Sequence, residues 1–251
     1  MTYVVPCDAI TLVKRIREPV NLIATDPPYF GIVSQDWDNQ WKSVDDYAAW
    51  WADHCAAFLS IAAPNSTLIF FGATGMHGHR PFWRAVEACE KSGWRSRDII
   101  TWGKKRAYGK STDYLYCREE IAFFTNTWGN EHTFNVPLTT EKRQNDNPKA
   151  KYQAKSEFKR VTNVWSDITE VMAPERECQK PIELMERIVA THSNVNDVVI
   201  DPFVGWGTTG VACGNLSRKF AGSDTAEDWE DAEKRIEYAF SRRCVDGRVS
   251  L

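Results

Sequence analysis

Short apolar runs alternate with amphipathic helical patterns along most of this 251-residue chain. Strand-length apolar runs, of the kind buried on both faces of a sheet, occur at residues 20–25, 66–72, 197–201 and 219–222. Further strands are expected at 98–102 and 120–125. Helical spacing of apolar residues covers 43–63, 81–91, 181–192, 208–216 and 226–242. This alternation predicts an α/β fold with a mostly parallel sheet and helices on both faces.

Residues 126–163 interrupt this alternation, because they are polar, basic and without apolar periodicity. They predict a long loop or a small irregular lobe. Residues 104–160 carry 12 Lys and Arg against 7 Asp and Glu, a net charge of +5 in a chain whose overall charge is −3. This asymmetry predicts a basic face for an anionic partner, with a solvated charged loop as the alternative.

The seven cysteines are odd in number and include no C-x-x-C pair. This pattern argues against a disulfide framework or a zinc site and predicts a reducing, cytoplasmic location. No apolar run has the length of a membrane-spanning helix, and the N-terminus lacks the pattern of a signal peptide. We therefore expect neither a membrane partner nor a bound metal.

The first strand end with unusual chemistry is Asp26-Pro27-Pro28-Tyr29, directly after the run at 20–25. Ligands of open α/β sheets bind beyond the carboxyl ends of the strands. A proline fixes its own φ and restricts the preceding residue, so the two prolines would hold the Asp26 carboxylate and the Pro27 carbonyl still. A plain structural turn is the alternative for a motif this short.

The second such strand end runs from Asp201 through Gly205, Gly207 and Gly210. These glycines fit G-x-G-x-x-G, and Asp224 follows at a distance suited to ribose hydroxyls, so a nicotinamide or flavin oxidoreductase is one alternative. However, Asp-Pro-Phe separates the strand from the first glycine, and an acid there repels a pyrophosphate.

An acid at this position suits an ammonium group instead. The helix N-terminus at Thr208 and Thr209 can receive a carboxylate, and the glycines permit close approach of a ligand. S-adenosylmethionine combines an adenosine, an ammonium and a carboxylate, and it is the cofactor that we expect.

The two motifs together resemble those of the β-class amino DNA methyltransferases, with the catalytic motif first, a target-recognition region next and the cofactor motif last. Supporting stretches are Cys7-Asp8, Asp36-Trp37-Asp38 and Gln179-Lys180-Pro181. The resemblance covers residues 1–125 and 164–243 and is poor over 126–163. Trp206 stands where a small residue is usual, so its indole is expected to press on the cofactor or cover its pocket. Cys7 replaces a glycine, and Gly222-Ser223-Asp224 replaces Gly-Ile-Glu or Gly-Ile-Asp.

The resemblance implies an S-adenosylmethionine-dependent methyltransferase fold in circularly permuted order. Its parts would be a catalytic half at 1–125, a target-recognition insertion at 126–163 and a cofactor-binding half at 164–251. Asp26 and the Pro27 carbonyl would accept the hydrogens of an exocyclic amine, Pro28 would stiffen the turn, and Tyr29 would stack on a flipped base. Asp rather than Ser at position 26 favours adenine N6.

The resemblance also implies a set of cofactor-binding residues. They are Asp8, Lys180, Asp201, Phe203, Gly205, Gly207, Thr208, Thr209 and Asp224. Two of them have equally weighted alternatives: Lys180 as a solvated lysine at a helix start, and Asp8 as an ordinary surface acid.

Double-stranded DNA is the implied partner, with basic residues of 104–160 on phosphates. Gln144, Asn145 and Asn147 are side chains suited to adenine edges or simply to a loop. The alternatives are a cytosine-N4 methyltransferase and a non-catalytic DNA-binding protein with a degenerate methyltransferase fold. The sequence leaves open a homodimer, the recognised DNA site, and a partnership with a restriction nuclease.

Overall fold

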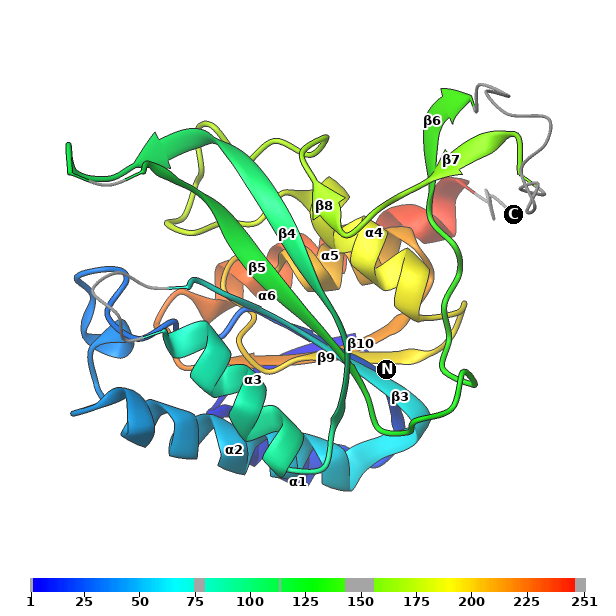
Figure 1. Cartoon of the computed structure of the whole chain (residues 1–251). Coiled ribbons are helices and arrows are strands. Elements are labelled where there is room, and N and C mark those ends of the chain that lie inside the picture. Colours follow the sequence, from blue (N-terminus) through cyan, green and yellow to red (C-terminus); the bar gives the residue numbers. More distant parts are fainter. Residues whose placement is uncertain (1, 75–79, 113, 143–155, 247–251) are drawn as a thin grey trace.

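The computed structural model describes residues 2–74, 80–112, 114–142 and 156–246, with side chains up to residue 242. Eight strands form one sheet in the order β1-β10-β9-β2-β3-β5-β4-β8 (Figure 1). The strands are β1 (Thr2–Pro6), β2 (Val20–Thr25), β3 (Ala62–Gly72), β4 (Arg95–Tyr108), β5 (Tyr116–Thr125), β8 (Val164–Trp165), β9 (Val198–Asp201) and β10 (Lys219–Asp224). Only β5 in this sheet runs against its neighbours, so the predicted mostly parallel sheet is confirmed.

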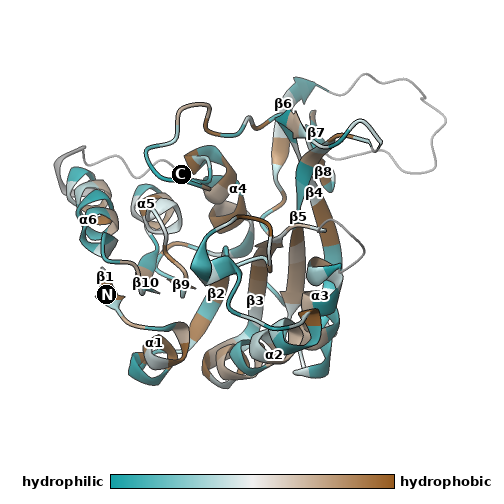
Figure 2. Cartoon of the chain, turned by 90° about the vertical axis from the view of Figure 1, so that its left-hand side faces the viewer, coloured by the Kyte–Doolittle hydropathy of each residue, from teal (hydrophilic) through white to brown (hydrophobic). Residues whose placement is uncertain are grey.

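Helices cover both faces of the sheet (Figures 1 and 2). One face carries α1 (Ala9–Arg15), α2 (Val44–Ile61) and α3 (Pro81–Lys91), and the other carries α4 (Ile182–His192), α5 (Thr208–Asn215) and α6 (Trp229–Asp246). In β2, Leu22 faces the α4–α6 core and Ile23 faces the α1–α3 core, and both are fully buried. Burial on both faces explains why this strand is apolar at consecutive positions.

The sheet extends beyond the sequence prediction at its first strand. β1 and α1 were not predicted, and β1 pairs with β10 in parallel, with Pro6 opposite Asp224. The predicted catalytic half thus contributes a strand to the side of the sheet that holds the predicted cofactor residues.

The insertion at 126–163 contains a two-stranded sheet of β6 (Leu138–Lys142) and β7 (Phe158–Arg160). Just before it, Asn135 bonds to Thr191 at the end of α4, so β6 begins near the amino ends of the parallel strands. The hairpin between β4 and β5 instead extends past the carboxyl edge of the parallel strands, at the end of β4 and the start of β5 (Figure 1). None of the helices in the described part of the chain is long and apolar enough to span a membrane.

Candidate active site

The two motifs singled out in the sequence meet at the carboxyl edge of the sheet. β2 and β9 are neighbours, with Ile23 opposite Ile200, so Asp26 and Asp201 end adjacent strands. The Thr25 hydroxyl donates a hydrogen bond of 2.8 Å to Asp201 and joins the two strand ends directly. The contact is buried, which fixes one motif against the other.

The loop after the Asp-Pro-Pro-Tyr motif is organised by Asp38, which lies in the short 3-10 helix η1 (Asp36–Asp38) and is fully buried. Its Oδ1 accepts the backbone N–H groups of Tyr29 at 2.6 Å and Phe30 at 3.0 Å. Its Oδ2 accepts those of Ile32 at 2.6 Å and Val33 at 3.0 Å. One carboxylate therefore holds four backbone N–H groups of the loop that begins at the motif.

The two proline carbonyls of the motif have different surroundings. The Tyr47 hydroxyl donates to the Pro28 carbonyl at 3.0 Å, from the first turn of α2. Within the described residues no protein donor reaches the Pro27 carbonyl. This oxygen is therefore an available acceptor beside the Asp26 carboxylate.

Asp26 is the first member of a chain of alternating charges. The Lys180 ammonium lies 2.5 Å from Asp26 Oδ2 and 3.1 Å from Glu119 Oε2. The Lys104 ammonium contacts the other Glu119 oxygen, Oε1. The Tyr29 hydroxyl donates to Asp26 Oδ1 and lies 3.3 Å from Glu119. Tyr29 and Lys180 thus contact the predicted catalytic carboxylate directly, and Glu119 and Lys104 extend the same cluster.

Burial and charge oppose each other in this cluster. Burial raises the pKa of Asp26, the Lys180 charge lowers it and the Glu119 charge raises it further, with a net rise. Burial alone would lower the pKa of Lys180, but the Asp26 and Glu119 charges raise it above the ordinary lysine value. Lys180 is therefore a protonated ammonium held between two carboxylates.

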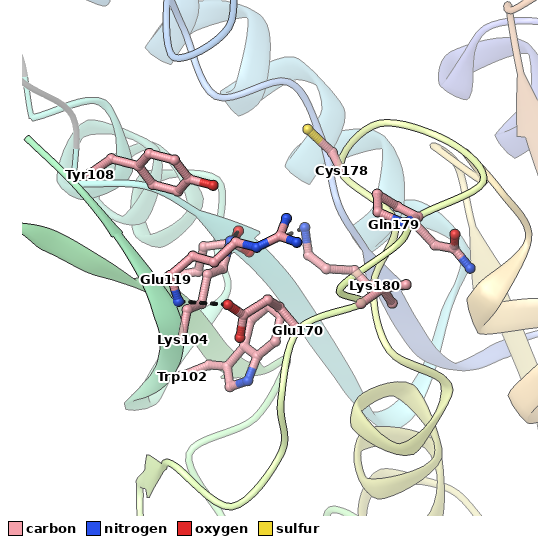
Figure 3. Close-up of a pocket in the computed structure, with 11 residues that line it drawn as sticks. Trp102, Lys104, Tyr108, Glu119, Glu170, Cys178, Gln179 and Lys180 are labelled. Carbon is pink, nitrogen blue, oxygen red and sulfur yellow. Dashed lines mark hydrogen bonds and ion pairs between the residues drawn. The ribbon is translucent and has the colours of Figure 1, made fainter.

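A pocket of about 180 Å³ opens next to this cluster (Figure 3). Trp102, Tyr108 and Glu119 line it from β4 and β5, and Cys178 and Lys180 line it from the loop before α4. Aromatic walls and a charged floor are the surroundings that a planar heterocycle with an exocyclic amine requires.

The glycine turn after β9 presents open backbone at one position. Gly205 has φ of +52°, no atom lies within 4 Å of the place where its Cβ would be, and its N–H donates to Asp224 at 2.7 Å. A Cβ on Gly207, with φ of +79°, would lie 3.1 Å from Ala232 and Ile236. Gly205 therefore leaves room for a ligand, whereas Gly207 serves the packing of α6.

The Asp201 carboxylate is buried and occupied by donors from the protein. Besides Thr25, it accepts the Thr209 hydroxyl at 2.5 Å and the Phe203 N–H at 3.1 Å. Burial raises its pKa to about 7, against these hydrogen bonds. In the structure this acid ties strand, turn and helix together, and its role as a cofactor ligand stays a prediction.

The remaining predicted cofactor residues also have partners within the fold. Asp8 is the exposed N-cap of α1 and accepts the Thr11 N–H at 2.9 Å. The Thr208 hydroxyl donates to the Lys180 carbonyl at 3.3 Å. Phe203 packs against Trp50 of α2, with ring centroids 5.8 Å apart.

Trp206 is fixed from two sides. Its indole N–H donates to Glu175 at 3.0 Å, and the Arg235 guanidinium lies over the ring, 5.0 Å from its centroid. Arg176, next to Glu175, donates to the Gly205 carbonyl at 3.0 Å. The segment before α4 thus holds the glycine turn at two points, the Gly205 carbonyl and the Trp206 indole.

The described basic residues of 104–160 divide into two groups. On the β6–β7 hairpin, Lys142 pairs with Glu157 at 2.6 Å and Lys159 pairs with Glu141 at 2.8 Å. These pairs lie away from the carboxyl edge that carries Asp26 (Figure 1).

The second group lies on the β4–β5 hairpin at that edge, where Lys105, Arg106 and Lys110 are exposed beside the exposed rings of Tyr108 and Tyr114. Gln144, Asn145 and Asn147, the predicted readers of adenine edges, lie outside the described residues.

Known proteins with similar sequences include Type II methyltransferases. The Type II methyltransferase M2.LlaDCHI of Lactococcus lactis subsp. cremoris is 28% identical over 260 residues, which span 92% of this chain and 88% of the relative. M2.DpnII of Streptococcus pneumoniae is 28% identical over 250 residues, which span 90% and 85%.

Solved structures share the fold. M1.HpyAVI matches with a TM-score of 0.66 at 24% identity, over 94% of this chain and 98% of that one. The PvuII DNA methyltransferase, described as cytosine-N4-specific, matches with a TM-score of 0.69 at 14% identity, over 98% and 93%. A family model for DNA methylases of the N6/N4 type matches residues 20–234. This chain therefore belongs to the N6/N4 DNA methylase family.

Proposed function

We propose that this chain transfers a methyl group from S-adenosylmethionine to the N6 amine of adenine within a specific duplex DNA sequence. The observation that carries the proposal is the junction at the carboxyl edge, where Thr25 links the Asp26 strand to the Asp201 strand at 2.8 Å. The Asp26 carboxylate, held by Lys180 and Tyr29, the Pro27 carbonyl and an open glycine turn lie at the ends of adjacent strands there. Type II methyltransferases among its relatives support site-specific modification.

The turn at Gly205 suits the cofactor. Its φ of +52° and the open space at its Cβ position allow an adenosine or methionine moiety to approach the backbone. Asp224 accepts the Gly205 N–H and is the last residue of β10, where it can also meet ribose hydroxyls. The cofactor supplies a sulfonium methyl group, and the protein supplies its position relative to the amine.

Asp26 and Pro27 would activate the amine. The lone pair of an exocyclic amine is delocalised into its ring, so the nitrogen is a poor nucleophile. Two acceptors aimed at its two N–H bonds draw it toward tetrahedral geometry and stabilise the positive charge that develops there. The Asp26 carboxylate and the unoccupied Pro27 carbonyl are such a pair, and Asp38 and Tyr47 hold their loop in place.

The target base would leave the duplex to reach this edge, at a cost of a few kcal/mol. We assign the pocket beside Glu119 and Lys180 to the extruded base, because the exposed ring of Tyr108 lines it and offers a face for stacking. Stacking on an aromatic ring contributes about 1–3 kcal/mol per base. The Tyr29 hydroxyl contacts Glu119 and Lys180, which line this pocket, and stacking of the Tyr29 ring on the base is part of the proposal.

The β4–β5 hairpin would contact the duplex around the extruded base. Its exposed Lys105, Arg106 and Lys110 suit phosphates, and its exposed Tyr108 and Tyr114 suit bases. The paired lysines of the β6–β7 hairpin offer less free charge to DNA.

The test is to methylate DNA with purified protein and labelled S-adenosylmethionine, then to digest the product to nucleosides. Label in N6-methyladenine supports the proposal, and long-read sequencing of the same DNA would give the recognition sequence. Label found only in N4-methylcytosine would refute the adenine assignment and identify cytosine as the target base.

A non-catalytic DNA-binding protein is the alternative from another class. It predicts DNA binding without any heat of S-adenosylmethionine binding in calorimetry. Asp26→Ala separates the two sites: methyl transfer should vanish while cofactor affinity stays largely intact, because the cofactor turn lies on the neighbouring strand.

A further inference from the structure

Lys180 has no hydrogen-bond donor left for a ligand. An ammonium carries three N–H donors. In the structure they meet Asp26 Oδ2 at 2.5 Å, Glu119 Oε2 at 3.1 Å and the Tyr29 hydroxyl at 3.1 Å. The residue is only 7% exposed, although it directly precedes Pro181 and α4. Its geometry therefore points to Asp26 rather than to a cofactor carboxylate.

Without the ammonium, two carboxylates would face each other. The Tyr29 hydroxyl bridges Asp26 and Glu119, and both carboxylates are largely withdrawn from water. Lys104 compensates Glu119 from the far side but has no contact with Asp26 among the described interactions. Two neighbouring carboxylates, one buried and one about three-quarters buried, would compete for a proton, which favours the neutral acid form of one of them.

A neutral Asp26 would be a poor acceptor for the target amine, because one of its oxygens would then carry a hydrogen. We propose that Lys180 is a positioning residue for methyl transfer, which keeps the Asp26 carboxylate charged and directed at the amine. Glu119 is the second carboxylate that binds the Lys180 ammonium and holds it in place. This inference rests on the proposed function. It replaces the sequence-based assignment of Lys180 to the cofactor.

The experiment compares Lys180→Met with the double variant Lys180→Met/Glu119→Gln. Rates at saturating DNA and cofactor are measured from pH 5 to pH 9. We expect Lys180→Met to move the acid limb of the profile to higher pH by about one unit or more, which is about a tenfold loss or more at pH values below that limb. The double variant should move the limb back, because Glu119 no longer competes for the negative charge.

Glu120→Gln is the matched control. Glu120 is the next residue in β5, is also buried, and pairs with Arg118 at 2.9 Å and Thr101 at 2.7 Å instead of with the Asp26 cluster. It should leave the acid limb unchanged. Urea unfolding of every variant identifies any that fails to fold, and Lys180→Arg keeps the charge as a further conservative variant.

A cofactor role for Lys180 predicts a different result. In that case Lys180→Met weakens S-adenosylmethionine binding in calorimetry, leaves the acid limb in place, and gains nothing from Glu119→Gln; this result would overturn the inference. A second measurement needs no methyl transfer, so it tests the inference even if the proposed function is wrong. In ¹³C-carboxyl NMR the Asp26 titration should move to higher pH in Lys180→Met even if the protein methylates nothing, and an unmoved titration refutes the inference.

Discussion

Replacing Asp38 by Asn tests whether one carboxylate holds the catalytic loop. The carboxylate accepts four backbone N–H groups, two on each oxygen, at 2.6 to 3.0 Å. An asparagine has the same shape but only one acceptor oxygen, so its NH₂ group would face two N–H donors. The substitution therefore removes two hydrogen bonds without creating a cavity.

Hydrogen bonds to a charged acceptor contribute about 1.5–3 kcal/mol each. Losing two of them in this fully buried position should lower the free energy of unfolding by about 3 kcal/mol, if the loop unfolds together with the domain. If the loop opens on its own, global stability changes less, but the Pro27 carbonyl and Asp26 lose their fixed positions. In that case the rate of methyl transfer should fall by about tenfold or more, since misplacement by about 1 Å is costly.

Urea unfolding and single-turnover methylation would measure both effects on the same preparation. Asp36→Asn is the matched control, because Asp36 begins the same 3-10 helix, is exposed, and has no side-chain bond to the loop among the described interactions. If Asp38→Asn matched Asp36→Asn in both stability and rate, the four-bond account of the loop would be wrong.

Three further changes test other parts of the structure. Gly205→Ala should weaken S-adenosylmethionine binding by about tenfold in calorimetry, because a Cβ at φ of +52° is strained and fills the open space at the turn. Burial, with a smaller effect of a nearby histidine, lowers the pKa of His192 to about 3, so the native state resists its protonation. The free energy of unfolding should therefore be highest above about pH 6.5 and fall by up to about 4 kcal/mol as the pH drops toward 3. Urea unfolding of His192→Phe should show a smaller decline over this pH range. Lys105→Ala with Lys110→Ala should reduce the salt slope of DNA binding by about two, whereas Lys159→Ala on the β6–β7 hairpin should not.

The sequence predicted the layers of the fold because its buried strands carry runs of consecutive apolar residues. Leu22 and Ile23 face opposite cores, so the run at β2 could be recognised without knowing its neighbours. Strand β1 lies at the edge of the sheet with only Val4 buried, and helix α1 has seven residues, so neither gives such a signal. The capping pattern of Asp8 with Thr11 was nonetheless present in the sequence and could have indicated the start of α1.

The candidate site was predictable where its residues are neighbours in the chain. Asp26 to Tyr29 form one rigid motif, and their local order is visible in the sequence. Glu119 is 93 residues away in sequence from Asp26, beside an equally acidic Glu120, and only strand alternation and the sheet register decide which of the two faces Lys180. For the same reason the sequence could not show that the Lys180 ammonium lies between Asp26 and Glu119.

The order of the motifs along the chain matters little to the site, because the contacts that assemble it are tertiary. Asp201 receives Thr25 from the strand of the catalytic motif and Thr209 from the helix of the glycine turn, so a single buried acid sets the distance between the two. Lys180 makes a second link, since its backbone carbonyl accepts Thr208 while its ammonium holds Asp26. Both links depend on β2 lying beside β9, which holds for either order of the two halves. A circularly permuted chain can therefore present the same acceptors and the same glycine turn, provided that these two strand ends stay adjacent.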